Sequence, residues 1–212
     1  MKTIKLSAIA MLSVAMMACS NEEKTEQTPV VEEVKKEACT YAYDASTTSV
    51  NWTAYKLSSK DAVKGKFDSV VVENVTVSEI AEDVLVGANF IISTSSLNSG
   101  DAERDPKIIN SFFNVMKETS VITGNILEAK NGDAKIRLTM NNVSLEIPAK
   151  YEVIENELKL KTTLNIPDWG AQNALDALNK VCSVRHTGPD GVNKLWPNVE
   201  VVVSTTLKKE CK

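Results

Sequence analysis

The sequence is poor in the residues from which metal sites, active sites and nucleic-acid surfaces are built. Its 212 residues include one histidine and no Cys-x-x-Cys pair, which argues against a structural zinc site. It has no Gly-x-Ser-x-Gly elbow, phosphate-binding loop or carboxylate pair of catalytic spacing. Its 24 basic and 28 acidic residues form no basic stripe, so the attraction to phosphate backbones is missing. We expect no metal, no cofactor and no nucleic-acid partner.

The single histidine offers little support for catalysis. His186 follows Arg185 and precedes Thr187-Gly188, a segment that we interpret as a solvated loop. Ser183 as nucleophile and Asp190 as orienting carboxylate could complete a triad, but no strand-to-helix setting accompanies them. Asp105, which could be mistaken for a catalytic acid, is expected to be a helix N-cap. We therefore expect that the protein is not an enzyme and predict no catalytic residue.

Long hydrophobic runs are absent too, except at the start of the chain. Lys2 and Lys5 precede an apolar run over residues 6–18, which is shorter than the about 20 residues of a transmembrane helix. This pattern predicts a secretory signal peptide over residues 1–18. The motif Met16-Met17-Ala18-Cys19 resembles the bacterial lipobox, whose cysteine becomes the lipidated first residue of the mature chain. We expect an anchor at Cys19 that holds the protein in the cell envelope, on the periplasmic face of the outer membrane or at the cell surface.

The segment after Cys19 is polar. Ser20-Asn21-Glu22-Glu23 resembles the acidic export tag of some Bacteroidetes lipoproteins. Residues 19–38 contain no aromatic side chain and many charged ones, so they cannot bury enough surface to offset chain entropy. We predict a lipidated cysteine with a flexible tether over residues 19–38 and a folded domain over residues 39–212.

The four cysteines leave three for the folded domain once Cys19 carries lipid. In an oxidising compartment Cys39, Cys182 and Cys211 can form one disulfide and leave one thiol. Cys39 lies just before the first expected strand and Cys211 just after the last, and these points are neighbours in a closed antiparallel barrel. A disulfide between Cys39 and Cys211 is our first choice, and a bridge from Cys182 to either one is the alternative.

Alternation of apolar and polar residues dominates the sequence from residue 40 onward. It is clearest over residues 134–140, 145–153, 158–166 and 199–207, and this period of two predicts half-buried strands. Asn131-Gly132, Asn141-Asn142 and Glu155-Asn156 supply short hairpin turns between them. Further strands are expected over residues 48–57, 63–77, 84–94 and 119–129. The sequence thus predicts an all-β fold, an eight-stranded antiparallel up-and-down β-barrel of the lipocalin-like kind.

Two helical inserts interrupt the expected meander. Asp105-Pro106 precedes apolar residues at helical spacing over residues 108–116, and Asp168 precedes a second such set over residues 174–181. We expect these two short helices to plug or cover the ends of the barrel.

Several motifs resemble those of the YceI-like family. They are, in chain order, Val63-Lys64-Gly65-Lys66-Phe67, Leu97-Asn98-Ser99-Gly100, Arg104-Asp105, Phe112-Phe113 and Leu138-Thr139-Met140-Asn141-Asn142-Val143. The resemblance covers residues 41–208, with two departures: the histidine of the first strand is missing at residues 44–49, and Asn142 stands where the family usually has a hairpin glycine. It implies a lipocalin-like barrel that encloses a long isoprenoid or other lipid chain, with homodimerisation possible.

Strand phase selects the residues expected to face such a ligand. They are Trp52, Ala54, Phe67, Phe90, Phe113, Leu138, Ile147, Tyr151, Leu160 and Val201. With the resemblance, these residues predict that the barrel binds and carries or sequesters an apolar lipid such as a polyisoprenoid. The alternative is that they simply fill the core of a ligand-free envelope interaction module. A continuous unfilled interior would favour the first, and packing to native density the second.

Overall fold

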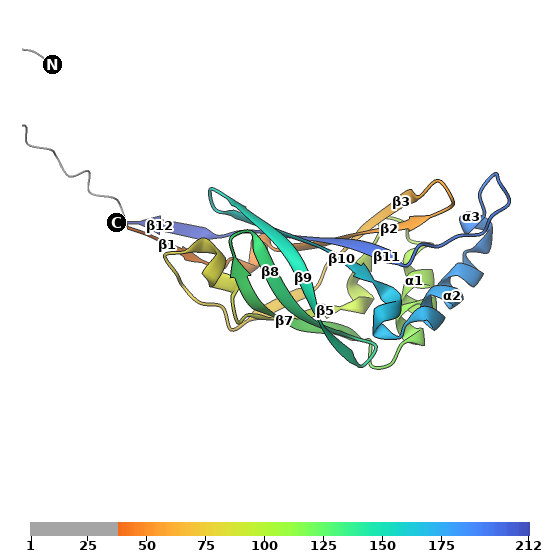
Figure 1. Cartoon of the computed structure of the whole chain (residues 1–212), viewed down its shortest axis with the longest axis horizontal. Helices are drawn as coiled ribbons and strands as arrows, with labels where there is room; N and C mark the ends of the chain where they lie inside the picture. Colours follow the sequence, from red (N-terminus) through yellow and green to blue (C-terminus); the bar gives the residue numbers. More distant parts are fainter. Residues whose placement is uncertain (1–37) are drawn as a thin grey trace, which may run out of the picture. The chain divides into compact units, whose positions relative to one another are not determined.

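The computed structural model describes residues 38–212, and the chain there adopts an all-β fold with few helices (Figure 1). The predicted signal peptide over residues 1–18, the lipidation of Cys19 and the tether up to residue 37 lie outside the described residues. Residues 38–212 contain a large curled antiparallel sheet, its core and one disulfide. Because this unit has its own hydrophobic core, we expect it to fold by itself.

The large sheet has ten strands, and all neighbouring pairs are antiparallel. In spatial order the strands are β4 (Val70–Glu73), β5 (Asn89–Ser93), β7 (Val121–Lys130), β8 (Asp133–Met140), β9 (Val143–Ile154), β10 (Glu157–Asn165), β11 (Asn198–Thr206), β2 (Ser49–Lys56), β3 (Asp61–Phe67) and β6 (Leu97–Asn98). A separate ladder joins β1 (Cys39–Ala42) to β12 (Lys208–Cys211). The meander from β7 to β10 follows the predicted order.

The large sheet has ten strands and not the predicted eight, because one expected strand is divided in two and the short strand β6 follows β5 as a separate strand. The strand predicted over residues 63–77 divides into β3 and β4 at Asp68-Ser69. The Asp68 N–H donates to the Ser96 carbonyl oxygen at 3.0 Å, and the Ser69 N–H donates to Ser96 Oγ at 3.0 Å. The strand predicted over residues 84–94 begins in the 3₁₀ helix η2 (Ala81–Leu85) and reaches extended geometry only in β5. Side-chain alternation does not report such bends, because it persists on both sides of them.

The predicted hairpin turns between the central strands are present. Asn131 and Gly132 have φ angles of 54° and 83°, and Asn141 and Asn142 have 52° and 58°. Positive φ at both central residues is what a two-residue type I′ turn requires. Asn141 also tethers the helical end, since its Nδ2 donates to the Trp169 carbonyl at 2.8 Å and its Oδ1 accepts from the Lys117 N–H at 2.7 Å.

The α-helices gather at one end of the domain, and the β1–β12 ladder lies at the other (Figure 1). They are α1 (Asp105–Ser111), α2 (Gln172–Val181) and α3 (Ser183–His186), accompanied by the 3₁₀ helices η4 (Phe113–Val115) and η5 (Ile166–Trp169). Two further 3₁₀ turns are η1 (Ala45–Thr47) and η3 (Thr94–Ser96). Within residues 38–212 no helix has the length and apolar character needed to cross a bilayer.

The N-cap role expected for Asp105 is wrong. Asp105 is the first residue of α1, and its Oδ1 accepts hydrogen bonds from the N–H and hydroxyl of Ser99. Asp101 holds the turn before the helix, because its Oδ1 accepts from the N–H groups of Glu103 and Arg104, each at 3.0 Å. Asp105 therefore fixes the loop against the helix and has a structural role.

Two clusters of buried apolar side chains form the core. The first lies toward the helices and includes Trp52, Phe113 and Trp169. The second lies toward the β1–β12 ladder and includes Val84, Leu158 and Leu207. Three half-buried side chains, Phe90, Ile147 and Val203, pack against both clusters. They therefore mark the junction between the two halves of the interior.

Two glycines let large rings cross the inner face of the sheet. A Cβ at Gly65 would lie 2.2 Å from Cζ2 of Trp52, and a Cβ at Gly124 would lie 2.4 Å from Cζ of Phe90. Each glycine faces its aromatic residue in the strand ladder, Gly65 opposite Trp52 and Gly124 opposite Phe90. The missing side chains make room for the two rings beside the neighbouring strand.

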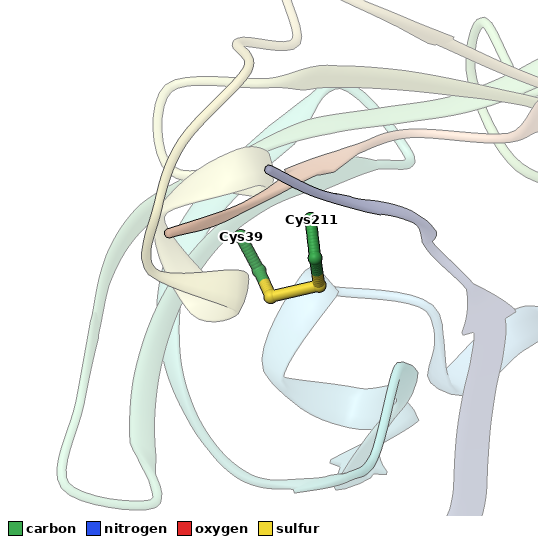
Figure 2. The surroundings of a disulfide bond; sticks show 2 residues. All are labelled: Cys39 and Cys211. Atoms are coloured by element: carbon green, nitrogen blue, oxygen red, sulfur yellow. A yellow bond between two sulfur atoms is a disulfide. The ribbon is translucent and has the colours of Figure 1, made fainter. Parts of the chain in front are cut away.

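A disulfide joins Cys39 to Cys211 and so links the two ends of the domain's chain (Figure 2). The two residues are also direct partners in the β1–β12 ladder, with Cα atoms 4.0 Å apart. This is the pairing that we chose first from the sequence. Cys182 is a free, half-buried thiol.

Candidate functional site

A cavity of about 220 Å³ lies inside the curled sheet. Its wall reaches both core clusters and includes the three junction residues Phe90, Ile147 and Val203. A water molecule needs only about 10–15 Å³ of such space, so the cavity has room for a chain of many atoms. The interior of this domain is therefore not packed to native density throughout.

The structure places nine of the ten side chains selected from strand phase on the cavity wall. They are Trp52, Ala54, Phe67, Phe90, Phe113, Leu138, Ile147, Leu160 and Val201. Eight of them come from seven different strands, and Phe113 comes from the 3₁₀ helix η4, so the cavity depends on the curl of the sheet and not on one element. Their contact with a ligand remains a prediction.

Tyr151 does not line the cavity. Its position in β9 has the same phase as Ile147, but η2 lies across this end of the sheet, and the Tyr151 hydroxyl donates to Oε1 of Glu82 at 3.3 Å. Burial raises the pKa of the Tyr151 hydroxyl, and the nearby Glu82 adds to this effect. Strand phase correctly predicts that the Tyr151 side chain points toward the interior. It does not line the cavity because η2, from another part of the chain, covers it.

The cavity wall also includes residues that were not among the ten selected from the sequence. Val199 and Val203 share the phase of Val201 in β11, so the same signal could have found them. The helices contribute Ile108, Phe112, Leu175 and Leu178 from the apolar faces that predicted the helices, and Leu195 and Trp196 come from an irregular loop. No local pattern marks Leu195 and Trp196, because only the fold brings that loop to the end of the sheet.

The cavity wall carries no charged side chain, and its few hydroxyl groups already have partners. The hydroxyl of Thr48 lies 2.8 Å from Tyr43 Oη and 2.9 Å from Thr205 Oγ1, and Thr162 donates to the Pro148 carbonyl at 2.8 Å. The buried indole N–H of Trp52 has no hydrogen-bond partner. Burying a charged or strongly polar ligand against such a wall would cost several kcal/mol, so the cavity suits a carbon chain.

His186 is not the solvated loop residue that the sequence suggested. It ends α3 with 8% of its surface exposed, and its Nδ1 lies 2.8 Å from Oδ1 of Asn179. Asp190 instead accepts from the Val192 N–H at 3.0 Å. The structure therefore does not assemble Ser183, His186 and Asp190 into a triad, and His186 serves to attach α3 to α2.

We expect His186 to make the stability of the domain depend on pH. Burial, with a smaller contribution from the charge of Lys56, lowers the pKa of the imidazole. The unfolded chain then binds a proton more readily than the folded one below the ordinary pKa of about 6.5. The free energy of unfolding should be constant just above that pH and fall as the pH drops below it, by at most about 1.4 kcal/mol per pH unit.

Urea unfolding at a series of pH values from about 7.5 to about 5 measures this effect. The His186→Gln variant should lose the slope in this window, because the lowered pKa values of carboxylates such as Asp44 and Asp101 act at lower pH. An equal slope in both proteins would show that His186 is not responsible.

Within residues 38–212 no group of three or more histidine, cysteine, aspartate or glutamate side chains is placed to hold a metal ion. Asp68, Asp101 and Asp105 line a shallow polar hollow near β6, which shares only Leu97 with the wall of the apolar cavity. We assign no ligand to this hollow.

Comparisons with known proteins agree with the fold. A family model described as the YceI-like domain matches residues 41–207. A polyisoprenoid binding domain from Saccharophagus degradans is similar in structure, with a TM-score of 0.55 and 15% identity over 84% of this chain and 100% of that one. Burkholderia cenocepacia BcnA has a TM-score of 0.49 and 11% identity over 79% of this chain and 99% of its own. No curated protein matches.

Proposed function

The chain belongs to the YceI-like family, and on that premise we propose that it binds an apolar chain, an isoprenoid or other lipid, inside its curled sheet. The observation that carries the proposal is the cavity of about 220 Å³ with its almost wholly apolar wall. The similar domain from S. degradans is described as polyisoprenoid binding, which supports isoprenoids as the first ligands to test.

The energetic case rests on the unfilled space. Cavities in protein cores cost about 24 cal/mol for each Å³, which for this volume is on the order of 5 kcal/mol. That cost is comparable to the whole stability of many domains. A bound hydrocarbon chain would recover the missing contacts and would add about 0.8 kcal/mol for each CH₂ group removed from water.

The connectivity of the sheet supports an eight-stranded barrel as the framework of the site. β3 and β4 are separated only by Asp68-Ser69, and β5 and β6 only by the short turn η3. β3 pairs with β6, and β4 pairs with β5. We interpret each of these two segments as one bent strand, which gives eight strands in a closed meander and leaves no open edge for the ligand to escape through.

We further propose that the protein acts as a carrier or reservoir at the bacterial envelope and not as an enzyme. The predicted signal peptide and the lipobox-like motif ending at Cys19 support this location. The apolar cavity offers no charged group with which to activate a bond, and His186 is engaged with Asn179. Binding, protection and delivery of the chain are the functions that such a cavity can perform.

Native mass spectrometry with organic extraction tests the proposal. We expect the domain of residues 38–212, purified from a bacterial envelope, to retain one lipid or isoprenoid per chain. The intact mass of the mature full-length protein checks the anchor, which adds acyl chains at Cys19. An apo mass together with no uptake of geranylgeraniol, a twenty-carbon isoprenoid alcohol, would favour the ligand-free interaction module.

A further inference from the structure

One end of the domain combines basic, aromatic and exposed apolar side chains. It consists of residues 55–61, the β2–β3 hairpin, and residues 180–196, which include α3, and we call these two segments the tip (Figure 1). The Leu57 N–H donates to the Lys194 carbonyl at 2.9 Å, and the Trp196 N–H donates to the Tyr55 carbonyl at 2.9 Å. The two segments therefore form one connected surface.

The inner side of the tip belongs to the cavity wall. Leu195 and Trp196 line the cavity, and so does Leu178 in the α2 turn just before the tip. All three side chains are half-buried. A chain that passes between the cavity and the outside at this end would thus meet apolar atoms for the first part of its path.

The outer side of the tip exposes three valines. Val184 in α3 is 89% exposed, Val181 is 52% exposed and Val192 is 46% exposed. Burying one such side chain against hydrocarbon contributes about 1.5–3 kcal/mol. Within residues 38–212 Val184 is almost uncovered, and Val181 and Val192 keep about half of their surface open to solvent.

The charge of the tip is opposite to that of the rest of the domain. The tip holds the five basic residues Lys56, Lys60, Lys180, Arg185 and Lys194 and the two acidic residues Asp61 and Asp190, whereas residues 38–212 together hold 19 basic and 22 acidic ones. The remainder of the domain therefore has 14 basic and 20 acidic residues. The tip forms a local positive surface on an acidic domain.

Three of these lysines are available to an external partner. Arg185 lies 3.3 Å from Glu103 and 3.7 Å from Asp101, and Lys56 Nζ donates to the Arg185 carbonyl. Lys60, Lys180 and Lys194 take part in none of the ion pairs between residues 38 and 212. The Lys194 ammonium lies 3.7 Å from the centre of the Trp196 ring, and that of Lys60 lies 4.8 Å from the Tyr55 ring.

We propose that the tip docks on the surface of an anionic phospholipid bilayer and that the cavity exchanges its apolar ligand there. Lysines beside tryptophan and tyrosine, with valines exposed between them, are the combination that favours a membrane interface. Exchange at this end would spare the ligand a passage through water, because Leu195 and Trp196 continue the wall to the docking surface. The exchange step rests on the function proposed above, whereas the docking step does not.

Vesicle co-sedimentation of residues 38–212 tests the docking step. We expect binding to vesicles of phosphatidylcholine and phosphatidylglycerol in equal parts, weaker binding at high salt, and little binding to phosphatidylcholine alone. A lysine near an anionic surface contributes about fivefold in affinity, so Lys60→Gln, Lys180→Gln and Lys194→Gln combined should weaken binding on the order of 100-fold. The matched control replaces Lys117, Lys130 and Lys209 with glutamine, three exposed lysines outside the tip that take part in none of the ion pairs between residues 38 and 212.

A second pair of variants tests the apolar contact. Val184→Asp should weaken vesicle binding by about tenfold or more, while Ile154→Asp, at a residue 65% exposed in β9, should not. Equal loss in tip and control variants, or equal binding to neutral and anionic vesicles, would overturn the docking step. So would a tip that binds no vesicle but captures a protein partner.

Uptake of geranylgeraniol delivered in ethanol separates this proposal from the proposed function. The tip variants should keep this uptake and transfer the alcohol from anionic vesicles more slowly than the unmodified domain. Normal vesicle binding without any uptake would overturn the proposed function and the exchange step but not the docking step. Uptake with no vesicle binding would overturn the docking proposal alone.

Discussion

Replacing Ile147 with tryptophan is expected to weaken the binding of long apolar ligands strongly while the domain stays folded. Ile147 lines the cavity and packs against both core clusters, so its side chain stands where the two halves of the interior meet. An indole ring at this position would fill the passage. The ligand would then have to leave part of its length outside the cavity.

The expected size of this effect follows from the length of chain displaced. Each CH₂ group returned to water costs about 0.8 kcal/mol, so excluding one five-carbon isoprene unit costs about 4 kcal/mol. This corresponds to roughly a thousandfold increase in Kd. Titration with geranylgeraniol, followed by the quenching of tryptophan fluorescence or by native mass spectrometry, measures it.

Two further variants make the result decisive. Leu160→Trp places an indole on the cavity wall from β10 and should have a similar effect, which covers the case in which Ile147→Trp disturbs folding. Ser144→Trp adds the same ring to the exposed face of β9 and should leave the affinity unchanged. Unchanged affinity in both cavity variants would contradict the proposed site.

Removing the disulfide between Cys39 and Cys211 is expected to cause the largest loss of stability. The bond joins residues that are 172 positions apart and so restricts nearly the whole unfolded domain. The chain-entropy model gives about 5 kcal/mol for a loop of this length, and measured losses for native disulfides are about 2–5 kcal/mol. The β1–β12 ladder buries little side-chain surface, because β1 is half-buried and β12 is exposed.

Urea unfolding of the Cys39→Ala/Cys211→Ala variant measures this loss as a lower midpoint. The matched control is Cys182→Ala, which removes a half-buried thiol that forms no bridge and should change the free energy of unfolding much less. We expect the double variant to keep its affinity for geranylgeraniol under conditions where it is folded, because neither cysteine lines the cavity. A midpoint equal to that of the unmodified domain would show that the bridge does not stabilise the fold.

The sequence predicted the local features of the fold correctly. Alternation with a period of two located the long strands β7 to β11 and the side of each strand that faces the interior, because successive side chains of a strand point to opposite faces. Asn131-Gly132 and Asn141-Asn142 marked two hairpins, because asparagine and glycine tolerate positive φ. Eight of the nine expected site residues that lie on strands line the cavity wall, as this phase indicated.

Errors arose where a distant part of the chain decides the outcome. The break at Asp68-Ser69 depends on hydrogen bonds to Ser96, and the burial of His186 depends on Asn179 in α2. Tyr151 leaves the cavity wall because η2 lies over it. The alternation of apolar and polar residues within each affected segment does not indicate any of these contacts.

The sequence by itself therefore determined the strand phases, the turns, the family resemblance and the apolar character of the interior. Only the tertiary structure decided that this interior holds a cavity and that Leu195 and Trp196 complete its wall at the tip. The physical reason is that side-chain phase is a local property of each strand. The volume that strands enclose depends on how the whole sheet curls and on which helices and loops cover its ends.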